Sequence, residues 1–293
     1  GNTGTIGVGS SAGDLYIDGT ELAFITTNEL LLGGGQTTSI NVGSVSAAQS
    51  MGIELLRLDS GDRIVFGGTD STFRALSALA RNGIAVNTNL TTTESNLILD
   101  ANTDNDADST DNLAIAADRT LTSGGLLTLD ATSGGIDAAG GVTLNAKGDI
   151  NINDALTANG QITINADSDA TGQGIINIPT GVNVISSGNP ITLVGSNLTL
   201  NGNILAGAGS VAIRRSNVGT ITLGTGTRGM SISGAELARI TSTGLSIGGA
   251  TTRTLEVNGI TAANSNNIVG ITRLEAGADN GSVVFNGSAS VFN

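Results

Sequence analysis

Short stretches in which hydrophobic and polar residues alternate recur along the whole chain. In each, Ile, Leu or Val residues are separated by a single residue, most often threonine. Alternation with a period of two places one face of a β-strand in a core and the other face in solvent. The chain is therefore predicted to be all-β, with strands of about three to five residues. Clear examples are 97–101 (LILDA), 127–131 (LTLDA), 142–146 (VTLNA) and 162–166 (ITINA).

Glycine, asparagine, aspartate and serine separate these predicted strands. Glycine alone accounts for 44 of the 293 residues, and all four residue types tolerate the positive φ angles of tight corners. Very short strands between frequent corners favour a parallel β-helix (β-solenoid), in which coils stack at the strand spacing of ~4.8 Å. The count of 2 prolines fits, because almost every backbone N–H is needed in the ladders. A β-sandwich is the alternative fold, although longer strands and more aromatic residues are typical of it.

One segment departs from the alternating pattern and predicts a short helical insertion near 72–82. Hydroxyl residues that can cap a helix come first, helix formers follow, and Gly83 is placed to end the helix. On such a helix Phe73, Leu76 and Leu79 would share one face. That face would pack on the solenoid, and the alternative is a knob that binds a partner.

A long internal repeat sets the organisation of the chain. Residues 2–50 align without gaps with 217–265, and 20 of the 49 aligned positions are identical. With small insertions the match extends over 2–73 and 217–292, so the repeating unit has about 217 residues. We therefore expect a single continuous β-solenoid over 1–293, which would be a window on a longer repetitive protein.

The composition narrows the classes of function. The chain has no Cys, His or Trp, 1 Tyr and 5 Phe, and its net charge is −13. A Ser-His-Asp triad, a disulfide scaffold and the common zinc and haem sites are therefore excluded. The negative charge and the few aromatic residues oppose binding to nucleic acid or to anionic membranes. No hydrophobic run reaches the ~18 residues of a membrane span, so we expect no membrane insertion.

The densest acidic segment is 102–112, which we expect to be a loop between two strands. Asp104, Asp106 and Asp108 match the opening of oxygen-rich calcium loops. Asp111 lies close enough in sequence to add a fourth carboxylate. The glycine and the bidentate glutamate of an EF-hand loop are both replaced here. A Ca²⁺ ion held by these four aspartates is one hypothesis, a solvated acidic loop is the other, and no other cofactor is expected.

Paired carboxylates are the remaining catalytic candidates. Asp14 and Asp18 can share one face of a strand, and so can Asp59 and Arg57. Parallel β-helices include polysaccharide-cleaving enzymes, which use such acids together with sugar-binding aromatic residues. Neither pair has a supporting set of Tyr, Trp or His. We therefore predict no enzymatic activity and nominate no catalytic residue, and a polysaccharide-active β-helix enzyme is kept as the third hypothesis.

Three sequence features resemble the repeat region of large bacterial secreted adhesins, the filamentous haemagglutinin-like proteins of the two-partner-secretion type. They are the L-T-L-D/N-A and I-T-I-N-A strands, glycine-led runs such as 140–144, and the module E-L-A-x-I-T-x-x-x-L-x-I/L-G-G at 21–34 and 236–249. The resemblance covers nearly the whole chain. It implies a right-handed parallel β-helix that is exported to the cell surface or the medium, with an export signal outside this chain.

The leading prediction is a non-enzymatic extracellular β-solenoid that forms the repetitive shaft of a giant surface adhesin or fibre. The alternative is a self-assembling subunit of an extracellular filament, sheath or surface layer. The expected partners are adjacent repeat units or other copies of the chain, packed end to end or laterally, and a host or neighbouring-cell surface. Nucleic acid is not an expected partner. The length of the parent open reading frame separates the first two hypotheses.

Overall fold

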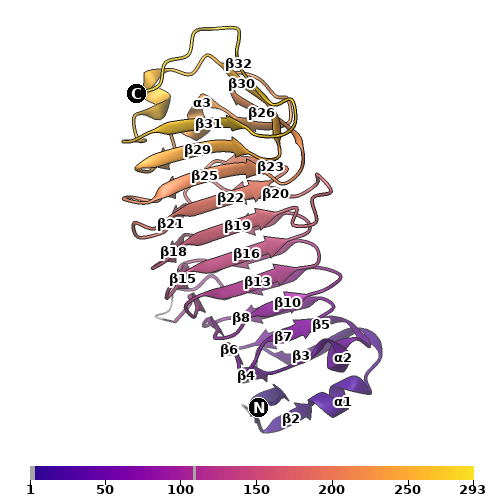
Figure 1. Ribbon diagram of the computed structural model, residues 1–293. Helices are drawn as coiled ribbons and strands as arrows, with labels where there is room; N and C mark the ends of the chain where they lie inside the picture. Colours follow the sequence, from indigo (N-terminus) through magenta and orange to yellow (C-terminus); the bar gives the residue numbers. More distant parts are fainter. Residues whose placement is uncertain (1–3, 108–109) are drawn as a thin grey trace. The chain divides into compact units, whose positions relative to one another are not determined.

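The computed structural model describes residues 4–107 and 110–293, which fold into two compact units (Figure 1). The first unit comprises Gly1–Val142 and Asn151–Asp154, and the second comprises Thr143–Ile150 and Ala155–Asn293. In the described residues both units consist of short strands and parallel ladders, with a few very short helices. The predicted all-β fold and the parallel β-solenoid are therefore confirmed within each unit. One continuous solenoid over 1–293 stays a prediction.

In the first unit the strands form parts of three parallel sheets. Their orders are β2-β1-β4-β6-β9-β12-β15, β3-β5-β8-β11-β14 and β7-β10-β13. From β7 onwards each coil therefore gives one strand to each sheet. The strands are β1 (Gly4–Gly9), β2 (Leu15–Asp18), β3 (Thr27–Gly34), β4 (Thr37–Gly43), β5 (Ile53–Ser60), β6 (Arg63–Gly67), β7 (Ser71–Phe73), β8 (Leu76–Ala80), β9 (Ile84–Val86), β10 (Leu90–Thr92), β11 (Leu97–Asp100), β12 (Leu113–Ile115), β13 (Arg119–Ser123), β14 (Leu127–Asp130) and β15 (Ile136–Ala138).

The second unit repeats this arrangement and adds a separate sheet. Its orders are β18-β21-β24-β28, β19-β22-β25-β29-β31, β20-β23 and β27-β26-β30-β32. Two further strands, β16 (Val142–Ala146) and β17 (Ile150–Ile152), each contain a boundary between the units. The others are β18 (Leu156–Ala158), β19 (Ile162–Ala166), β20 (Ile175–Ile178), β21 (Asn183–Ile185), β22 (Ile191–Gly195), β23 (Asn197–Leu200), β24 (Asn203–Leu205), β25 (Ser210–Arg215), β26 (Gly219–Gly224), β27 (Met230–Ile232), β28 (Ile240–Thr241), β29 (Gly244–Gly249), β30 (Thr252–Asn258), β31 (Thr272–Ala276) and β32 (Ser282–Phe285).

The alternating residues of each strand form the core. In β11, Leu97 and Leu99 are fully buried, and the residues between and after them face outward. The ladder pairs Leu97 with Leu76 on one side and with Leu127 on the other, so like residues stack from coil to coil. Each buried leucine of this kind contributes roughly 2–3 kcal/mol of transfer free energy. The stack of small aliphatic residues is therefore what holds the coils together.

The predicted helix near 72–82 is wrong, because this segment forms β7 and β8. In β8 the side chains of Leu76, Ala78 and Ala80 point inward, with the period of two of a strand. β8 also pairs with strands on both of its sides, β5 and β11. These two ladders satisfy its backbone groups, and alanine fits the narrow interior. Tertiary pairing has therefore overridden the helix propensity of this sequence.

The helices lie elsewhere and occupy equivalent positions in the two copies of the repeat. They are α1 (Gly19–Ala23), α2 (Ala47–Ser50), α3 (Gly234–Leu237) and α4 (Ala262–Ser265). α1 and α3 begin with a capping box, in which the N-cap side chain and the glutamate three residues later satisfy each other's backbone N–H groups. At α2 and α4 the side chains of Gln49 and Asn264 accept a hydrogen bond from the N–H of the N-cap residue. These contacts fix the corners between the strands of a module that the chain builds twice.

That module is defined here as residues 4–67 in the first unit and 219–285 in the second. The sheet order β2-β1-β4-β6 of the first copy matches β27-β26-β30-β32 of the second, strand for strand. Glycines make the same corner in both copies, since Gly33 has a φ of 98° and Gly248 a φ of 96°. A Cβ at either position would also collide with a carbonyl oxygen of the neighbouring strand. The corner therefore requires glycine in both copies.

Candidate functional surfaces

The acidic segment 102–112 lies between β11 and β12. Asp104 and Asp106 are exposed, whereas Asp111 is buried at the other end of the segment. The predicted ligand Asp108 lies outside the described residues. Within the part of the chain that the structure describes, no group of three or more carboxylates is arranged to hold a metal ion. The calcium site at Asp104, Asp106, Asp108 and Asp111 therefore stays a prediction.

Hydrogen bonds tie this acidic segment to the solenoid. The side-chain amide of Asn102, a buried residue, donates to the backbone carbonyls of Asp106, at 3.1 Å, and of Thr132. The backbone N–H of Asp106 lies 3.4 Å from a carboxylate oxygen of Asp104. These contacts are typical of a surface loop that is anchored at its base.

A second group of carboxylates forms a row on the outer face of the first unit. Asp100 and Asp130 are paired in register on β11 and β14. Asp130 accepts a hydrogen bond of 2.9 Å from the side chain of Asn153, and the adjacent Asp154 accepts one of 2.8 Å from the N–H of Ala131. We call Asp100, Asp130 and Asp154 the carboxylate row.

The carboxylate row favours protonation of two of its members. Burial, and then the charges of Asp130 and Asp154, raises the pKa of Asp100 above its ordinary value. The pKa of Asp154 is raised in the same way, by burial and by Asp130. The row was not predicted from the sequence. Its signal was present, because the strands LILDA and LTLDA place an aspartate at the same position of successive coils.

Of the two pairs that suggested catalysis, Arg57 and Asp59 share the outer face of β5, as expected. The other pair, Asp14 and Asp18, holds local structure together. Asp14 accepts hydrogen bonds from the backbone and side chain of Thr5, and these lower its pKa. Asp18 is the N-cap of α1 and accepts from the N–H groups of Thr20 and Glu21. Asp14 therefore ties down a strand edge and Asp18 caps a helix.

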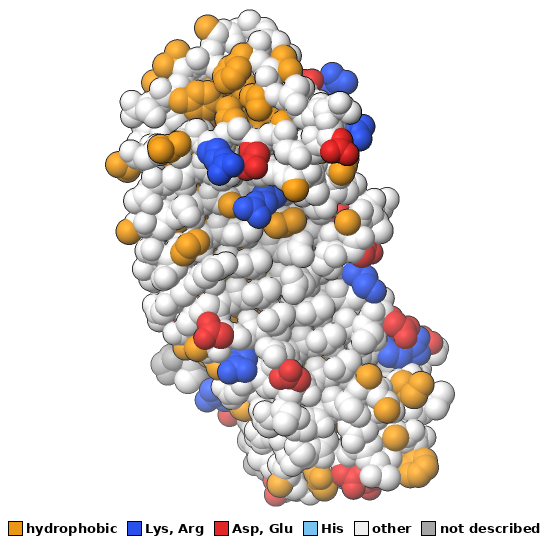
Figure 2. Space-filling view, viewed as in Figure 1, with side chains coloured by type: hydrophobic (Ala, Val, Ile, Leu, Met, Phe, Trp, Pro, Cys, Tyr) orange, Lys and Arg blue, Asp and Glu red, His pale blue; other side chains and the backbone are white. Residues whose placement is uncertain are grey.

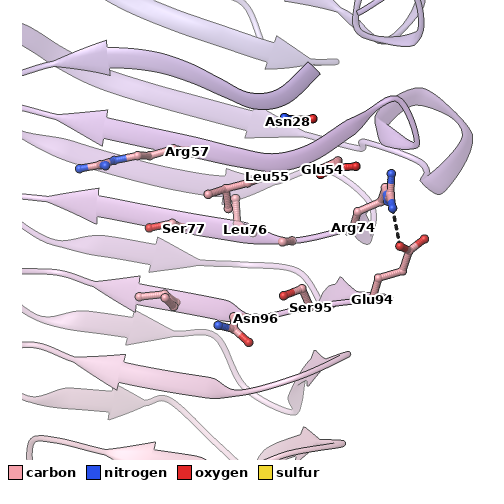
Figure 3. Close-up of a pocket in the computed structure, with 12 residues that line it drawn as sticks. Asn28, Glu54, Leu55, Arg57, Arg74, Leu76, Ser77, Glu94, Ser95 and Asn96 are labelled. Carbon is pink, nitrogen blue, oxygen red and sulfur yellow. Dashed lines mark hydrogen bonds and ion pairs between the residues drawn. The ribbon is translucent and has the colours of Figure 1, made fainter. Parts of the chain in front are cut away.

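A groove of about 500 Å³ runs across the outer face of the sheet that contains β3, β5, β8 and β11 (Figure 3). One end of the groove holds an ion pair of 2.6 Å between Arg74 and Glu94. Figure 3 shows Arg57 at the other end, pointing away from this pair. Its remaining lining is Asn28, Glu54, Leu55, Ala75, Leu76, Ser77, Ser95, Asn96 and Ile98.

Apart from the ion pair of Arg74 and Glu94, the groove is lined by one positive side chain, Arg57, and one negative side chain, Glu54. Among the described residues Arg57 makes no ion pair, and its Nε is buried without a hydrogen-bond partner. Ser77 is its register partner on β8. A guanidinium beside a hydroxyl can bind a carboxylate or a sulfate group. The groove lacks aromatic side chains, which are the usual platform for a sugar ring.

The surface of the second unit beside β31 and β32 is hydrophobic. In the described residues β31 pairs only with β29, and β32 pairs only with β30, so each has one free edge. Figure 2 shows hydrophobic side chains gathered at the end of this unit that carries the C-terminus. We call this the end surface, and its exposed large hydrophobic residues are Val269, Ile271, Val283, Val284, Phe285 and Val291.

The fold and its surfaces define a repetitive parallel β-solenoid. The chain matches no known protein family, no curated protein and no solved structure. In the described residues, no helix has both the length and the apolar character needed to cross a membrane.

Proposed function

We propose that this chain is a non-enzymatic, extracellular β-solenoid that serves as the repetitive shaft of a giant surface adhesin or fibre. The observation that carries the proposal is the module built twice, with one strand order, one set of capping boxes and one glycine corner. Repetition of a whole structural unit lengthens a solenoid without changing its cross-section. The resemblance to filamentous haemagglutinin-like repeats supports the same role.

A shaft also explains how the free edges of the end strands would be covered. Stacked coils pair every internal strand on both sides, so free edges remain only where a stack stops. Continuous repeats would cover these edges with the next unit. A core of Ile, Leu, Val and Ala and a chain without cysteine suit a protein that crosses a membrane unfolded and folds outside the cell.

Surface labelling of intact cells tests this proposal. Antibodies raised against the purified chain are expected to label the outside of unpermeabilised cells and to decorate a fibre in immunogold electron microscopy. Protease added to intact cells should remove the signal, while a cytosolic marker stays intact. Labelling that requires permeabilisation would overturn the extracellular shaft.

The free edges of β31 and β32 favour a second candidate, the self-assembling subunit of a filament, sheath or surface layer. Unpaired parallel strands can add strands from another molecule. This candidate predicts ordered polymers from the purified chain alone, visible by negative-stain electron microscopy. The shaft predicts a monomeric chain under the same conditions.

A further inference from the structure

The two copies of the module differ in what covers their last strands. In the first copy Phe66 on β6 is 0% exposed, and its equivalent in the second copy, Phe285 on β32, is 62% exposed. The pair Ile64 and Val283 shows the same contrast, at 0% and 39%. Because the strand order is the same in the two copies, the difference in burial comes from the neighbouring coil. The first copy has one, and the described second copy does not.

The equivalence of the two copies extends past these strands. The N–H of Val45 donates to the hydroxyl of Ser71 at 3.1 Å, and the N–H of Ile260 donates to the hydroxyl of Ser290 at 3.2 Å. The next backbone bond is also matched, because Thr72 donates to the carbonyl of Val45 and Val291 donates to that of Ile260. The second copy therefore follows the first as far as its last described residues.

The first copy shows which coil covers these strands. There β8 pairs with the free side of β5, so that Leu58 lies opposite Ala78. β9 pairs with the free side of β6, so that Phe66 lies opposite Val86. The covering coil is residues 75–86, and its inward positions are small or branched aliphatic residues.

We propose that the end surface binds a coil of the same repeat, with the sequence of residues 75–86. The register copies the first unit: Leu274 would lie opposite the position of Ala78, and Phe285 opposite the position of Val86. This choice of occupant rests on the proposed shaft function, in which one repeat unit follows another. The bound coil would bury Val283 and Phe285, the equivalents of the buried Ile64 and Phe66, and would satisfy the unpaired backbone groups of β31 and β32.

The N-terminal end of a second molecule is a poor match for this surface. At that end β2 leaves Leu15 52% exposed, whereas its equivalent Met230 on β27 is 1% exposed. In the second unit β24 pairs with β28, and the side chain of Asn197 on β23 accepts from the N–H of Ser231 on β27. The N-terminal end is thus shaped for the coil that contains β23 and β24. If the end surface met the N-terminal end of a second molecule, neither end would gain the strand partners that its equivalent has in the other copy of the module.

A longer chain, to which the next coils of the repeat are added, tests the proposal. Asn293 occupies the position of Arg74, so residues 75–142 are appended directly after it. Hydrogen–deuterium exchange of peptides from 272–286 is compared between the chain of 293 residues and the extended chain. The amides of β31 and β32 are expected to exchange at least tenfold more slowly in the extended chain. Unchanged exchange in β31 and β32 would overturn the proposal.

A matched control separates pairing from mere attachment. In the appended copy only, Ala78→Asp and Val86→Asp place charges where the coil should meet Leu274 and Phe285. This control is expected to return the exchange of β31 and β32 to that of the original chain. If the control protects as well as the unmodified extension, the proposed register is wrong.

Sedimentation of the original chain tests the competing occupant. We expect a monomer at all concentrations, because the two free ends do not match. A concentration-dependent dimer that Phe285→Lys abolishes would show that a second molecule is the occupant, and it would overturn the proposal. Both readouts are independent of where the protein resides, so intracellular labelling would overturn the shaft without affecting them.

Discussion

At the scale of single residues, the two copies of the module provide matched pairs in different surroundings. Phe66 is fully buried, whereas its equivalent Phe285 is largely exposed. We expect Phe66→Ala to lower the free energy of unfolding by about 3–5 kcal/mol, the usual cost of an aromatic cavity. Phe285→Ala should cost less than about 1 kcal/mol, because its side chain already contacts water. Urea unfolding of both variants measures the difference, and similar costs would contradict the burial contrast.

The carboxylate row gives a second prediction at this scale, for Asp154→Asn. A carboxyl group whose pKa is raised on folding binds its proton more tightly in the folded state. Its contribution to stability is complete below the unfolded pKa of about 3.9 and is lost as the pH rises through the folded pKa. The variant should therefore be more stable than the original chain at neutral pH. The advantage should vanish below the unfolded pKa, and thermal unfolding at several pH values measures it.

Asp167 is the control of opposite sign. Burial alone would raise its pKa, but hydrogen bonds from Ser216, Gly172 and Thr171 together lower it. Its contribution to stability is present above the unfolded pKa and is lost as the pH falls through the folded pKa. Asp167→Asn should therefore destabilise the chain at neutral pH, where Asp154→Asn stabilises it. The same direction for both variants would contradict the assigned causes.

At the scale of elements, β8 distinguishes a strand from the helix that the sequence predicted. A helix would bury Leu79 with Leu76, whereas the strand buries Ala78 and leaves Leu79 on the outer face. Ala78→Lys should therefore destabilise the chain by several kcal/mol, because it places a charge in the core. Leu79→Lys should cost less than about 1 kcal/mol. Circular dichroism during thermal unfolding compares the two, and a larger loss for Leu79→Lys would favour the helix.

The elements also show what sequence patterns can and cannot predict. The strands were predictable because a triplet such as 162–164 alternates with a period of two between turn residues. α1 and α3 span only five and four residues, too few for a helical period to appear. Their capping boxes were nevertheless readable, with Asp18 at the N-cap of α1 and Ser233 at that of α3.

The surfaces depend on register, which alternation does not specify. Arg57 and Ser77 are neighbours because β5 and β8 pair in one particular alignment. Asp100 meets Asp130 for the same reason. A parallel ladder joins residues about 20 to 30 positions apart, and turns of unequal length set each offset. The groove and the end surface therefore could not be predicted from alternation, whereas the fold class could. Of the carboxylate row, the matching LILDA and LTLDA strands indicate only Asp100 and Asp130.

At the scale of the whole molecule, a solenoid stabilises each coil through its immediate neighbours. Leu99 of β11 stacks between Ala78 of β8 and Leu129 of β14, and all three are fully buried. Such stacks approximate a sum of coil stabilities and nearest-neighbour terms. A cavity in one coil should therefore loosen the adjacent coils far more than distant ones, since local opening needs only the local contacts to be lost.

Leu99→Ala tests this nearest-neighbour behaviour. The substitution should cost about 2–5 kcal/mol at the site, and it should accelerate hydrogen exchange in β8, β11 and β14. The strands β25 and β29 of the second unit should keep their original exchange rates, because none of their pairing partners is altered. Equal acceleration in both units would mean that the molecule opens as one cooperative body. Confined acceleration means that a repeat can be added to or lost from such a chain without destabilising the coils beyond its neighbours, as a shaft of repeats requires.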